Sequence, residues 1–166
     1  FPLHDVGAIA TYNMLKGLAE AGIEVTYFSL NTRKHFVDDH TISREFAFLK
    51  SVKSFFIDTS IRPLDALSKL FGSRSYNIER FYSGEFESML IEEVKHHKYD
   101  IIHFEGLFVA KYIYALHRAC NSPAILRQHN VEFRIWETLA TNEKNPLKKW
   151  YLKLLAKRIR TFELSV

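Results

Sequence analysis

The chain has 166 residues, of which 47% are apolar and 25% are charged, and its formal net charge is +4. These values are typical of a soluble domain with its own hydrophobic core, so we expect a single domain over residues 1–166. The lone cysteine, Cys120, excludes an internal disulfide and a cysteine-rich metal site, and it suits a reducing, cytoplasmic location. The sequence has no run of about 20 apolar residues, which a membrane-spanning helix requires.

The positive charge does not by itself identify a partner. Lysine and arginine are scattered along the chain, except that they gather near its C-terminal end. A small phosphate-bearing ligand, an anionic membrane surface and a nucleic acid would each suit a modest positive charge.

The N-terminal part predicts a helix followed by a strand. Apolar residues recur at helical spacing over 7–21, Gly22 follows as a C-cap glycine, and the apolar run over 23–30 predicts a strand. Gly7 stands at the start of the helix, where backbone N–H groups and the helix dipole can bind an anion. The loop lacks G-x-G-x-x-G and G-x-x-x-x-G-K-(S/T), so the usual nicotinamide and nucleoside-triphosphate sites gain no support. The predicted buried stripe of the helix is Ile9, Tyr12, Leu15, Leu18 and Ala19.

The middle of the chain is predicted to be less regular. Its polar runs are typical of exposed loops, and a proline at the start of an apolar segment is typical of a short helix. In chain order, we expect an exposed loop with a short helix over 31–40, a strand over 52–57, a helix over 62–71 opened by Pro63, a loop over 72–76 and a longer helix over 77–97.

Residues 99–137 predict a β-α-β unit. The apolar runs at Ile101 and Ile102 and over 124–126 are typical of parallel strands that are buried on both faces. Between them, apolar residues recur at helical spacing. The apolar positions of this connecting helix include Leu107, Ala110, Tyr114, Leu116 and Ala119.

Polar and titratable residues follow both of these strands. Because the carboxyl ends of parallel strands meet at one edge of a sheet, we expect these residues to gather at a ligand site. The residues are His103, Glu105, Gln128, His129, Asn130 and Glu132.

The C-terminal part predicts two helices, the first running through Thr138 and the second over 147–164, with a break over 142–146. The second helix has an apolar stripe that predicts packing on the sheet. Its many basic residues leave open a peripheral contact with an anionic membrane, at the inner face of the membrane. The predicted stripe is Leu147, Trp150, Tyr151, Leu154, Leu155 and Ile159.

The two ends of the sequence lead us to expect a fragment. The chain starts in the loop-like stretch FPLHDVG without a methionine, and its last helical pattern has no stop signal before Val166. We therefore expect a strand before Phe1 and a further domain after Val166.

Several segments, in this order, resemble the N-terminal domain of GT-B-fold glycosyltransferases of the group 1 or family 4 type. The stretch FPLHDVGAIATYNMLKGLAEAGIEVTYFSL is similar to the family's first loop, helix and second strand. YDIIHFEG resembles its D-(I/V)-(I/V)-H strand, PAILRQHNVEFRIW resembles its P-x-(I/V)-x-x-x-H-(N/D) strand end, and RIRTFE resembles the helix before its crossing to the donor domain. Each motif is degenerate, so their order and spacing carry the resemblance, which covers nearly the whole chain.

The resemblance implies an α/β fold, namely a Rossmann-like, doubly wound, mostly parallel sheet with helices on both faces, which is one half of a GT-B fold. It also implies the acceptor-binding domain of a retaining, hexosyltransferase-type enzyme. Such an enzyme moves a sugar from a nucleotide-diphosphate sugar to a glycan or lipid-linked acceptor in polysaccharide or glycoconjugate biosynthesis. No metal, other cofactor or nucleic-acid partner is expected, and the fragment alone is expected to be inactive because donor binding belongs to the second domain.

The resemblance also assigns roles to individual residues. His129 matches the histidine that contacts the transferred sugar, so it is the expected catalytic residue. Gly7 matches the loop glycine that approaches the donor diphosphate, although many relatives have two glycines where this chain has Val6 and Gly7. The residues expected on the acceptor side are Glu105, Asn130 and Glu132.

Three alternatives remain open. His and carboxylate side chains at the strand ends could coordinate a divalent ion, the candidate ligands being His103, Glu105, His129 and Glu132. The chain could instead be a non-catalytic ligand-binding or regulatory domain of the doubly wound type, or its basic last helix could bind nucleic acid. Neither of the last two explains the polar residues at the strand ends.

Overall fold

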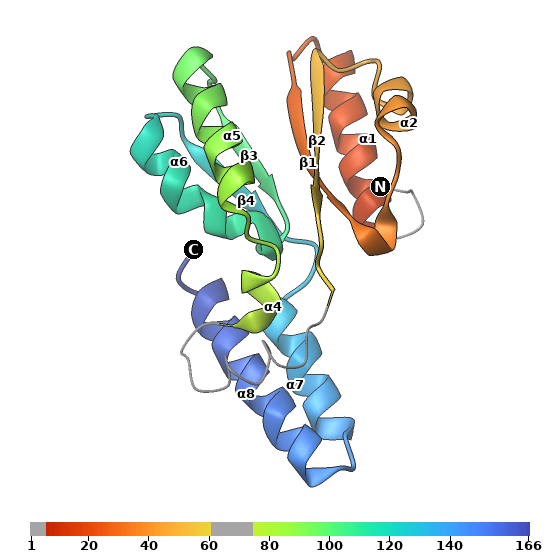
Figure 1. Cartoon of the computed structure of the whole chain (residues 1–166), viewed down its shortest axis with the longest axis vertical. Coiled ribbons are helices and arrows are strands. Elements are labelled where there is room, and N and C mark those ends of the chain that lie inside the picture. The colour runs from red at the N-terminus through yellow and green to blue at the C-terminus, as the bar shows by residue number, and fades with distance from the viewer. Residues whose placement is uncertain (1–5, 61–74) are drawn as a thin grey trace. The chain divides into compact units, whose positions relative to one another are not determined.

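The computed structural model describes residues 6–60 and 75–166, and the chain divides into two compact units after Ser60 (Figure 1). We call these unit 1 and unit 2 in chain order, and the expectation of a single domain stays a prediction. The predicted helix over 62–71 and most of the predicted loop over 72–76 lie outside the described residues. Both units combine helices with short parallel strands, so the predicted α/β fold class is confirmed.

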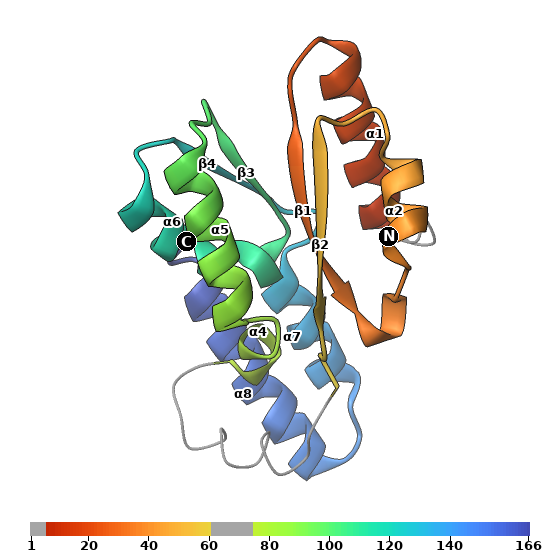
Figure 2. The same cartoon turned by 45° about the horizontal axis from the view of Figure 1, so that its top comes forward.

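Unit 1 is a pair of parallel strands with helices against one face. Its elements are α1 (Val6–Glu20), β1 (Thr26–Thr32), the 3-10 turn η1 (Arg33–His35), α2 (Asp39–Glu45) and β2 (Ser51–Ile57). β1 and β2 pair from Thr26 opposite Ser51 to Thr32 opposite Ile57, so the predicted second strand is confirmed. Helices α1 and α2 lie on the same side of these strands (Figures 1 and 2), and their apolar residues share one core cluster.

Helix α1 presents its inner face to the core of unit 1. Leu15 is only 4% exposed and packs in one cluster with Ile42 of α2. Gly22 ends the helix with a φ of +80°, and the N–H of Ile23 donates to the carbonyl of Leu18 across it, at 3.0 Å. The predicted C-cap is therefore confirmed, because this left-handed conformation is the one that glycine adopts without a steric penalty.

Two predictions within unit 1 are wrong. Ile9 is 44% exposed, since it is six residues from Leu15 and thus lies about 120° away around the helix. Asn31, predicted in an exposed loop, is 7% exposed and belongs to β1, which runs on to Thr32. Its side-chain amide donates to the Val37 carbonyl (2.6 Å) and its side-chain oxygen accepts from the Val37 N–H (3.1 Å). These two bonds hold the polar run after β1 against the strand.

Unit 2 contains the second pair of parallel strands. Its elements are α4 (Tyr76–Glu79), α5 (Gly84–His96), β3 (Ile102–Glu105), the 3-10 segment η3 (Leu107–Tyr112), α6 (Ile113–Ala119), β4 (Ala124–Arg127), α7 (Glu132–Asn142) and α8 (Pro146–Glu163). β3 and β4 pair in parallel, and η3 and α6 connect them. The predicted β-α-β unit over 99–137 is therefore confirmed.

The predicted helix over 77–97 is two helices rather than one. Ser83 has an extended backbone (φ −130°), and its hydroxyl accepts a hydrogen bond from the N–H of Phe86 at 3.4 Å, as an N-cap residue does. The N–H of Ser83 donates to the hydroxyl of the fully buried Tyr112 at 2.8 Å. This contact between distant parts of the chain stabilises the break, which the helical periodicity alone did not predict.

The β3–β4 pair is buried on one face. Phe104 is 6% exposed, and Leu126 packs against the core cluster that contains Leu107. Ile125, whose side chain points to the other face because side chains alternate along a strand, is 48% exposed, and Ile101 just before β3 is 55% exposed. The prediction that both faces are buried is therefore wrong at these two positions.

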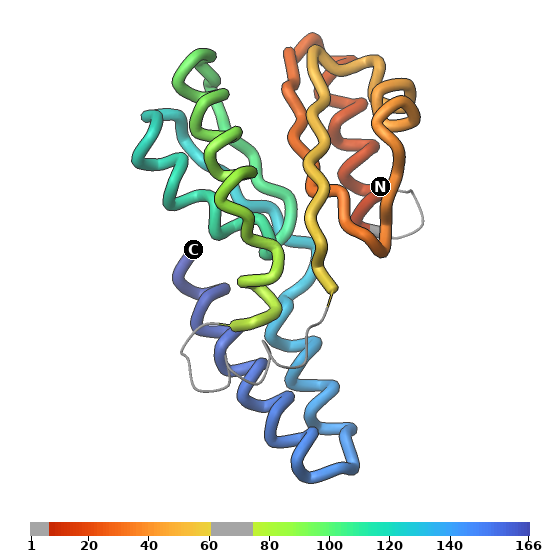
Figure 3. Tube along the Cα trace, in the orientation of Figure 1, coloured from red at the N-terminus to blue at the C-terminus, as the bar shows by residue number. Residues whose placement is uncertain are grey.

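Helices α7 and α8 form an antiparallel hairpin at one end of unit 2 (Figures 1 and 3). Ala140 of α7 packs in one buried cluster with Leu152 and Leu155 of α8. Asn145, in the turn between the helices, caps α8 because its side-chain oxygen accepts from the next two free N–H groups, at 3.0 and 3.1 Å. The two predicted C-terminal helices are confirmed, and α7 extends to Asn142.

The predicted apolar stripe of α8 is partly wrong. Leu147 is 79% exposed and Trp150 is 60% exposed, because α8 packs through a different row of residues. This buried row consists of Leu152, Leu155, Ala156 and Ile159.

No helix within residues 6–60 and 75–166 is long and apolar enough to cross a bilayer.

Candidate functional site

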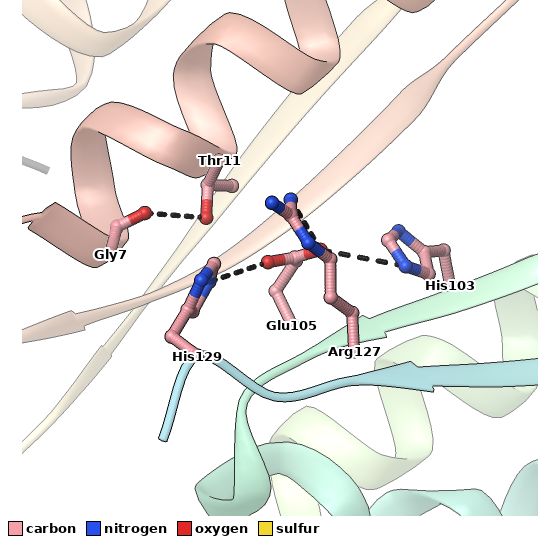
Figure 4. Close-up of polar contacts among 6 residues, drawn as sticks. All are labelled: Gly7, Thr11, His103, Glu105, Arg127 and His129. Carbon is pink, nitrogen blue, oxygen red and sulfur yellow. Dashed lines mark hydrogen bonds and ion pairs between the residues drawn. The ribbon is translucent and has the colours of Figure 1, made fainter.

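The register of β3 and β4 brings polar side chains together at their carboxyl ends. Glu105 is the register partner of Arg127, so both lie on the same face of the pair. His103 lies two residues before Glu105 on this face, and His129 follows β4. Figure 4 shows His103, Arg127 and His129 around the carboxylate of Glu105. The structure therefore brings together the sequence-predicted residues Glu105 and His129.

The Glu105 carboxylate is shared by three side chains that carry, or can carry, a positive charge. Its Oε2 lies 2.9 Å from Nε2 of His129 in a hydrogen bond. Its Oε1 lies 3.4 Å from Nε2 of His103 and 3.5 Å from Nη1 of Arg127. The Glu105 side chain is 16% exposed and that of His129 is 23% exposed, so solvent screens their interaction only in part.

A glycine at the end of β3 sets the position of Glu105. Gly106 has a φ of +88°, a conformation that other residues adopt at a cost, and the chain turns there from β3 into η3. The N–H of Gly106 donates to the carbonyl of Arg127 at 2.8 Å, which extends the strand pairing to the last residue of β4. Gly106 and Arg127 were not predicted as site residues, although a glycine directly after a strand and an arginine at a strand end are visible in the sequence.

The contact between Glu105 and His129 determines what the imidazole can do. An ionised carboxylate only accepts hydrogen bonds, so the proton of the neutral ring lies on Nε2. The other ring nitrogen, Nδ1, then carries a lone pair that can accept a hydrogen bond from a ligand hydroxyl. When the ring is protonated, the same nitrogen can donate to an oxygen that gains negative charge.

The start of α7 is capped by a residue that the sequence analysis did not identify. The carboxylate of Glu163, near the end of α8, accepts from the N–H groups of Glu132 (3.1 Å) and Phe133 (3.0 Å). The N-cap residue itself is Val131, which forms no side-chain hydrogen bond to the helix. Burial, and secondly the charge of Glu163, raise the pKa of Glu132.

Other predicted polar residues near the strand ends differ in their surroundings. Asn130 is exposed, and the side-chain oxygen of Gln128 is buried without a hydrogen-bond partner in the described part of the chain. Among the residues that the structure describes, no three His, Cys, Asp or Glu side chains are grouped to hold a metal ion. The alternative of a divalent site at His103, Glu105, His129 and Glu132 gains no support from this arrangement.

Gly7 belongs to unit 1 and lies in the first turn of α1. Its carbonyl accepts a hydrogen bond from the hydroxyl of Thr11 at 2.9 Å (Figure 4), which is the spacing of one helical turn. The residue is therefore at the positive end of the helix dipole, where the sequence analysis expected it.

Comparison with known proteins identifies the family of the chain. A family model described as Glycosyltransferase Family 4 matches residues 7–163, which is nearly the whole sequence and includes both units. No curated protein and no solved structure gives a significant match. The chain therefore belongs to glycosyltransferase family 4, as its motifs indicated.

Proposed function

We propose that this chain is the N-terminal, acceptor-binding domain of a retaining, hexosyltransferase-type glycosyltransferase. The whole protein would move a sugar from a nucleotide-diphosphate sugar to a glycan or lipid-linked acceptor in polysaccharide or glycoconjugate biosynthesis. Its donor-binding domain would follow Val166, so the fragment alone would be inactive. Membership of glycosyltransferase family 4 supports the reaction class.

The pairing of His129 with Glu105 is the observation that carries this proposal. Sugar transfer passes through an oxocarbenium-like state in which positive charge develops on the sugar and negative charge on the leaving phosphate. A neutral His129, held by Glu105 through Nε2, directs Nδ1 toward a sugar hydroxyl and fixes the orientation of the sugar. We assign the catalytic role to His129 on this basis.

The remaining site residues receive supporting roles in the proposal. Gly7 lies in the first turn of α1, where the helix dipole favours the growing negative charge of the donor diphosphate. Asn130 is exposed next to His129 in the sequence and can bond acceptor hydroxyls. Glu132 would contribute to the acceptor side through its carboxylate, although its backbone N–H is already used by Glu163.

The test is sugar transfer by the whole protein, including the proposed donor domain. We expect His129→Ala to reduce turnover of a nucleotide-diphosphate sugar by about 100-fold or more, as for loss of a positioned active-site group. The matched control is His117→Ala, because His117 is an exposed histidine on α6, outside the site.

Two results would contradict the proposal. Equal turnover by His129→Ala and His117→Ala would remove His129 from the site. Binding of a sugar ligand by the wild type without any turnover would favour the alternative, a non-catalytic ligand-binding or regulatory domain.

A further inference from the structure

Helix α8 carries two apolar rows, and only one of them is used in the core. The inner row packs against α7, and its residues Leu155 and Ile159 are 3% and 0% exposed. The outer row consists of Leu147, Trp150 and Leu154, which are three and four residues apart and therefore share one face of the helix. Leu147 and Trp150 are 79% and 60% exposed, so they leave large apolar side chains in solvent.

Basic side chains surround this outer row. α8 contains six lysine or arginine residues and a single carboxylate, that of Glu163, at its far end. Lys153 and Lys157 lie three and seven residues after Trp150, which places them beside it on the same face of the helix. Both lysines are exposed, and no ion pair within the described part of the chain includes either of them.

Contacts within the α7–α8 hairpin hold the outer row in place. Glu143 in the turn pairs with Lys148 at 2.6 Å, and burial of Ala140 fixes α7 beside α8. Asn145, two residues before Leu147, caps the start of α8 through its two hydrogen bonds. The outer row therefore needs no refolding to meet a partner.

We propose that the outer face of α8 docks on an anionic phospholipid surface. Tryptophan and leucine beside lysines are the composition of helices that lie in the membrane interface, where apolar side chains enter the acyl boundary and lysines reach the phosphates. The excess of positive charge on α8 complements anionic headgroups. This docking goes beyond the proposed transfer reaction and does not depend on it.

The experiment measures binding of the whole protein, including the proposed donor domain, to sedimenting vesicles of phosphatidylcholine, with and without phosphatidylglycerol. We expect binding that requires phosphatidylglycerol and weakens at high salt, together with a blue shift of tryptophan emission that is lost when Trp150 is replaced. Two double variants, Leu147→Ala with Trp150→Ala and Lys153→Gln with Lys157→Gln, should each weaken binding by about tenfold or more.

The matched control is Lys16→Gln with Lys95→Gln, which removes two lysines that are each 54% exposed on α1 and α5. This control should bind vesicles like the wild type. All the replaced side chains are exposed, so circular dichroism and the thermal midpoint should stay unchanged.

Several results would overturn the proposal. These are equal vesicle binding by all variants, or no binding by the wild type. Self-association that disappears in the Leu147 and Trp150 variant would identify a second copy as the occupant of this face. DNA or RNA binding that depends on the lysines but not on Trp150 would identify nucleic acid instead. None of these measurements requires sugar turnover, so failure here leaves the proposed enzymatic function standing.

Discussion

The imidazole of His129 and the carboxylate of Glu105 are joined by a hydrogen bond of 2.9 Å at the ends of two neighbouring parallel strands. Because this bond uses Nε2, Nδ1 is the ring nitrogen that Glu105 leaves available for a ligand. We infer that Glu105 positions the ring of His129, and the expected place of Glu105 on the acceptor side stays a prediction.

We predict that Glu105→Gln lowers kcat of the whole protein by about 10- to 100-fold, by analogy with carboxylates that orient metal-binding histidines. The amide can donate as well as accept, so it no longer fixes the proton on Nε2. Transfer rates measured against pH should show a changed profile, while KM for the donor changes little. Glu92→Gln, which removes an exposed carboxylate from α5, is the control. Similar kcat values for the two variants would refute the positioning role.

Removal of the Glu163 carboxylate should destabilise unit 2. Glu163→Ala leaves two N–H groups at the start of α7 without their protein acceptor, and loss of a helix cap costs about 1–2 kcal/mol. Urea unfolding monitored by circular dichroism measures the change. Glu137→Ala, which breaks only the exposed pair with Arg134, should cost less than about 0.5 kcal/mol. Equal costs would contradict the capping assignment.

The half-buried position of Glu132 predicts that replacing its carboxylate by a neutral group stabilises the fold in a pH-dependent way. Burial, and then the charge of Glu163, raise its pKa above that of the unfolded chain, so the folded state binds the proton more tightly. Its contribution to stability is then fully present below about pH 4.3 and is lost as the pH rises through the folded pKa. Glu132→Gln should therefore be more stable than the wild type at pH 7 and no more stable at pH 4. Unfolding midpoints at the two pH values test this, and an equal gain at both would contradict it.

Replacement of two glycines of unit 1 by alanine should change the stability of the fold in opposite directions. Gly22→Ala places a side chain at φ +80° and should destabilise by about 1–2 kcal/mol through backbone strain. Gly17→Ala, inside α1 with no atom within 4 Å of the added Cβ, should stabilise by about 0.5–1 kcal/mol. Thermal unfolding of both variants gives the comparison. A loss of stability in Gly17→Ala would show that the space beside α1 is not open.

Tyr112 should be the tyrosine whose hydroxyl matters most for stability. Its hydroxyl oxygen accepts from the N–H of Ser83 and its O–H donates to the carbonyl of Phe81, both at 2.8 Å, so Tyr112→Phe should cost about 1–3 kcal/mol. The exposed Tyr114, whose hydroxyl bonds Ser165 at 3.3 Å, is the control, and its replacement by Phe should be nearly neutral.

The burial of Tyr112 also predicts how the stability of the fold changes at alkaline pH. Burial raises the pKa of Tyr112 to about 12. Because this is above the value of about 10 in the unfolded chain, stability should fall as the pH rises from about 10 to about 12. Tyr112→Phe should reduce this fall, and an unchanged pH dependence in the variant would contradict the assignment.

Local patterns were sufficient for much of the fold. Alternation of apolar runs predicted the β-α-β unit of unit 2, and the position of Gly22 predicted the end of α1. The rule that parallel strands end at one edge of a sheet also predicted that Glu105 and His129 lie close together, as they do. These features depend on residues close in sequence or on a property of every parallel sheet.

Other features depend on contacts between distant segments, which sequence spacing does not contain. The bond from Ser83 to Tyr112 divides a predicted helix, and Glu163 caps α7 although 31 residues separate it from Glu132. In α8 the sequence offers two apolar rows with the same helical spacing. Only the packing of α7 against Leu152 selects the buried row, so Trp150 was assigned to the wrong side.

The cap provided by Glu163 also restricts which ligands the start of α7 can bind. The start of a helix ordinarily attracts phosphate, but the start of α7 already holds a carboxylate supplied by the protein itself. A phosphorylated ligand would have to displace Glu163 and would meet repulsion from it. We infer that the start of α7, three residues after His129 in sequence, is not where the phosphate of a ligand binds.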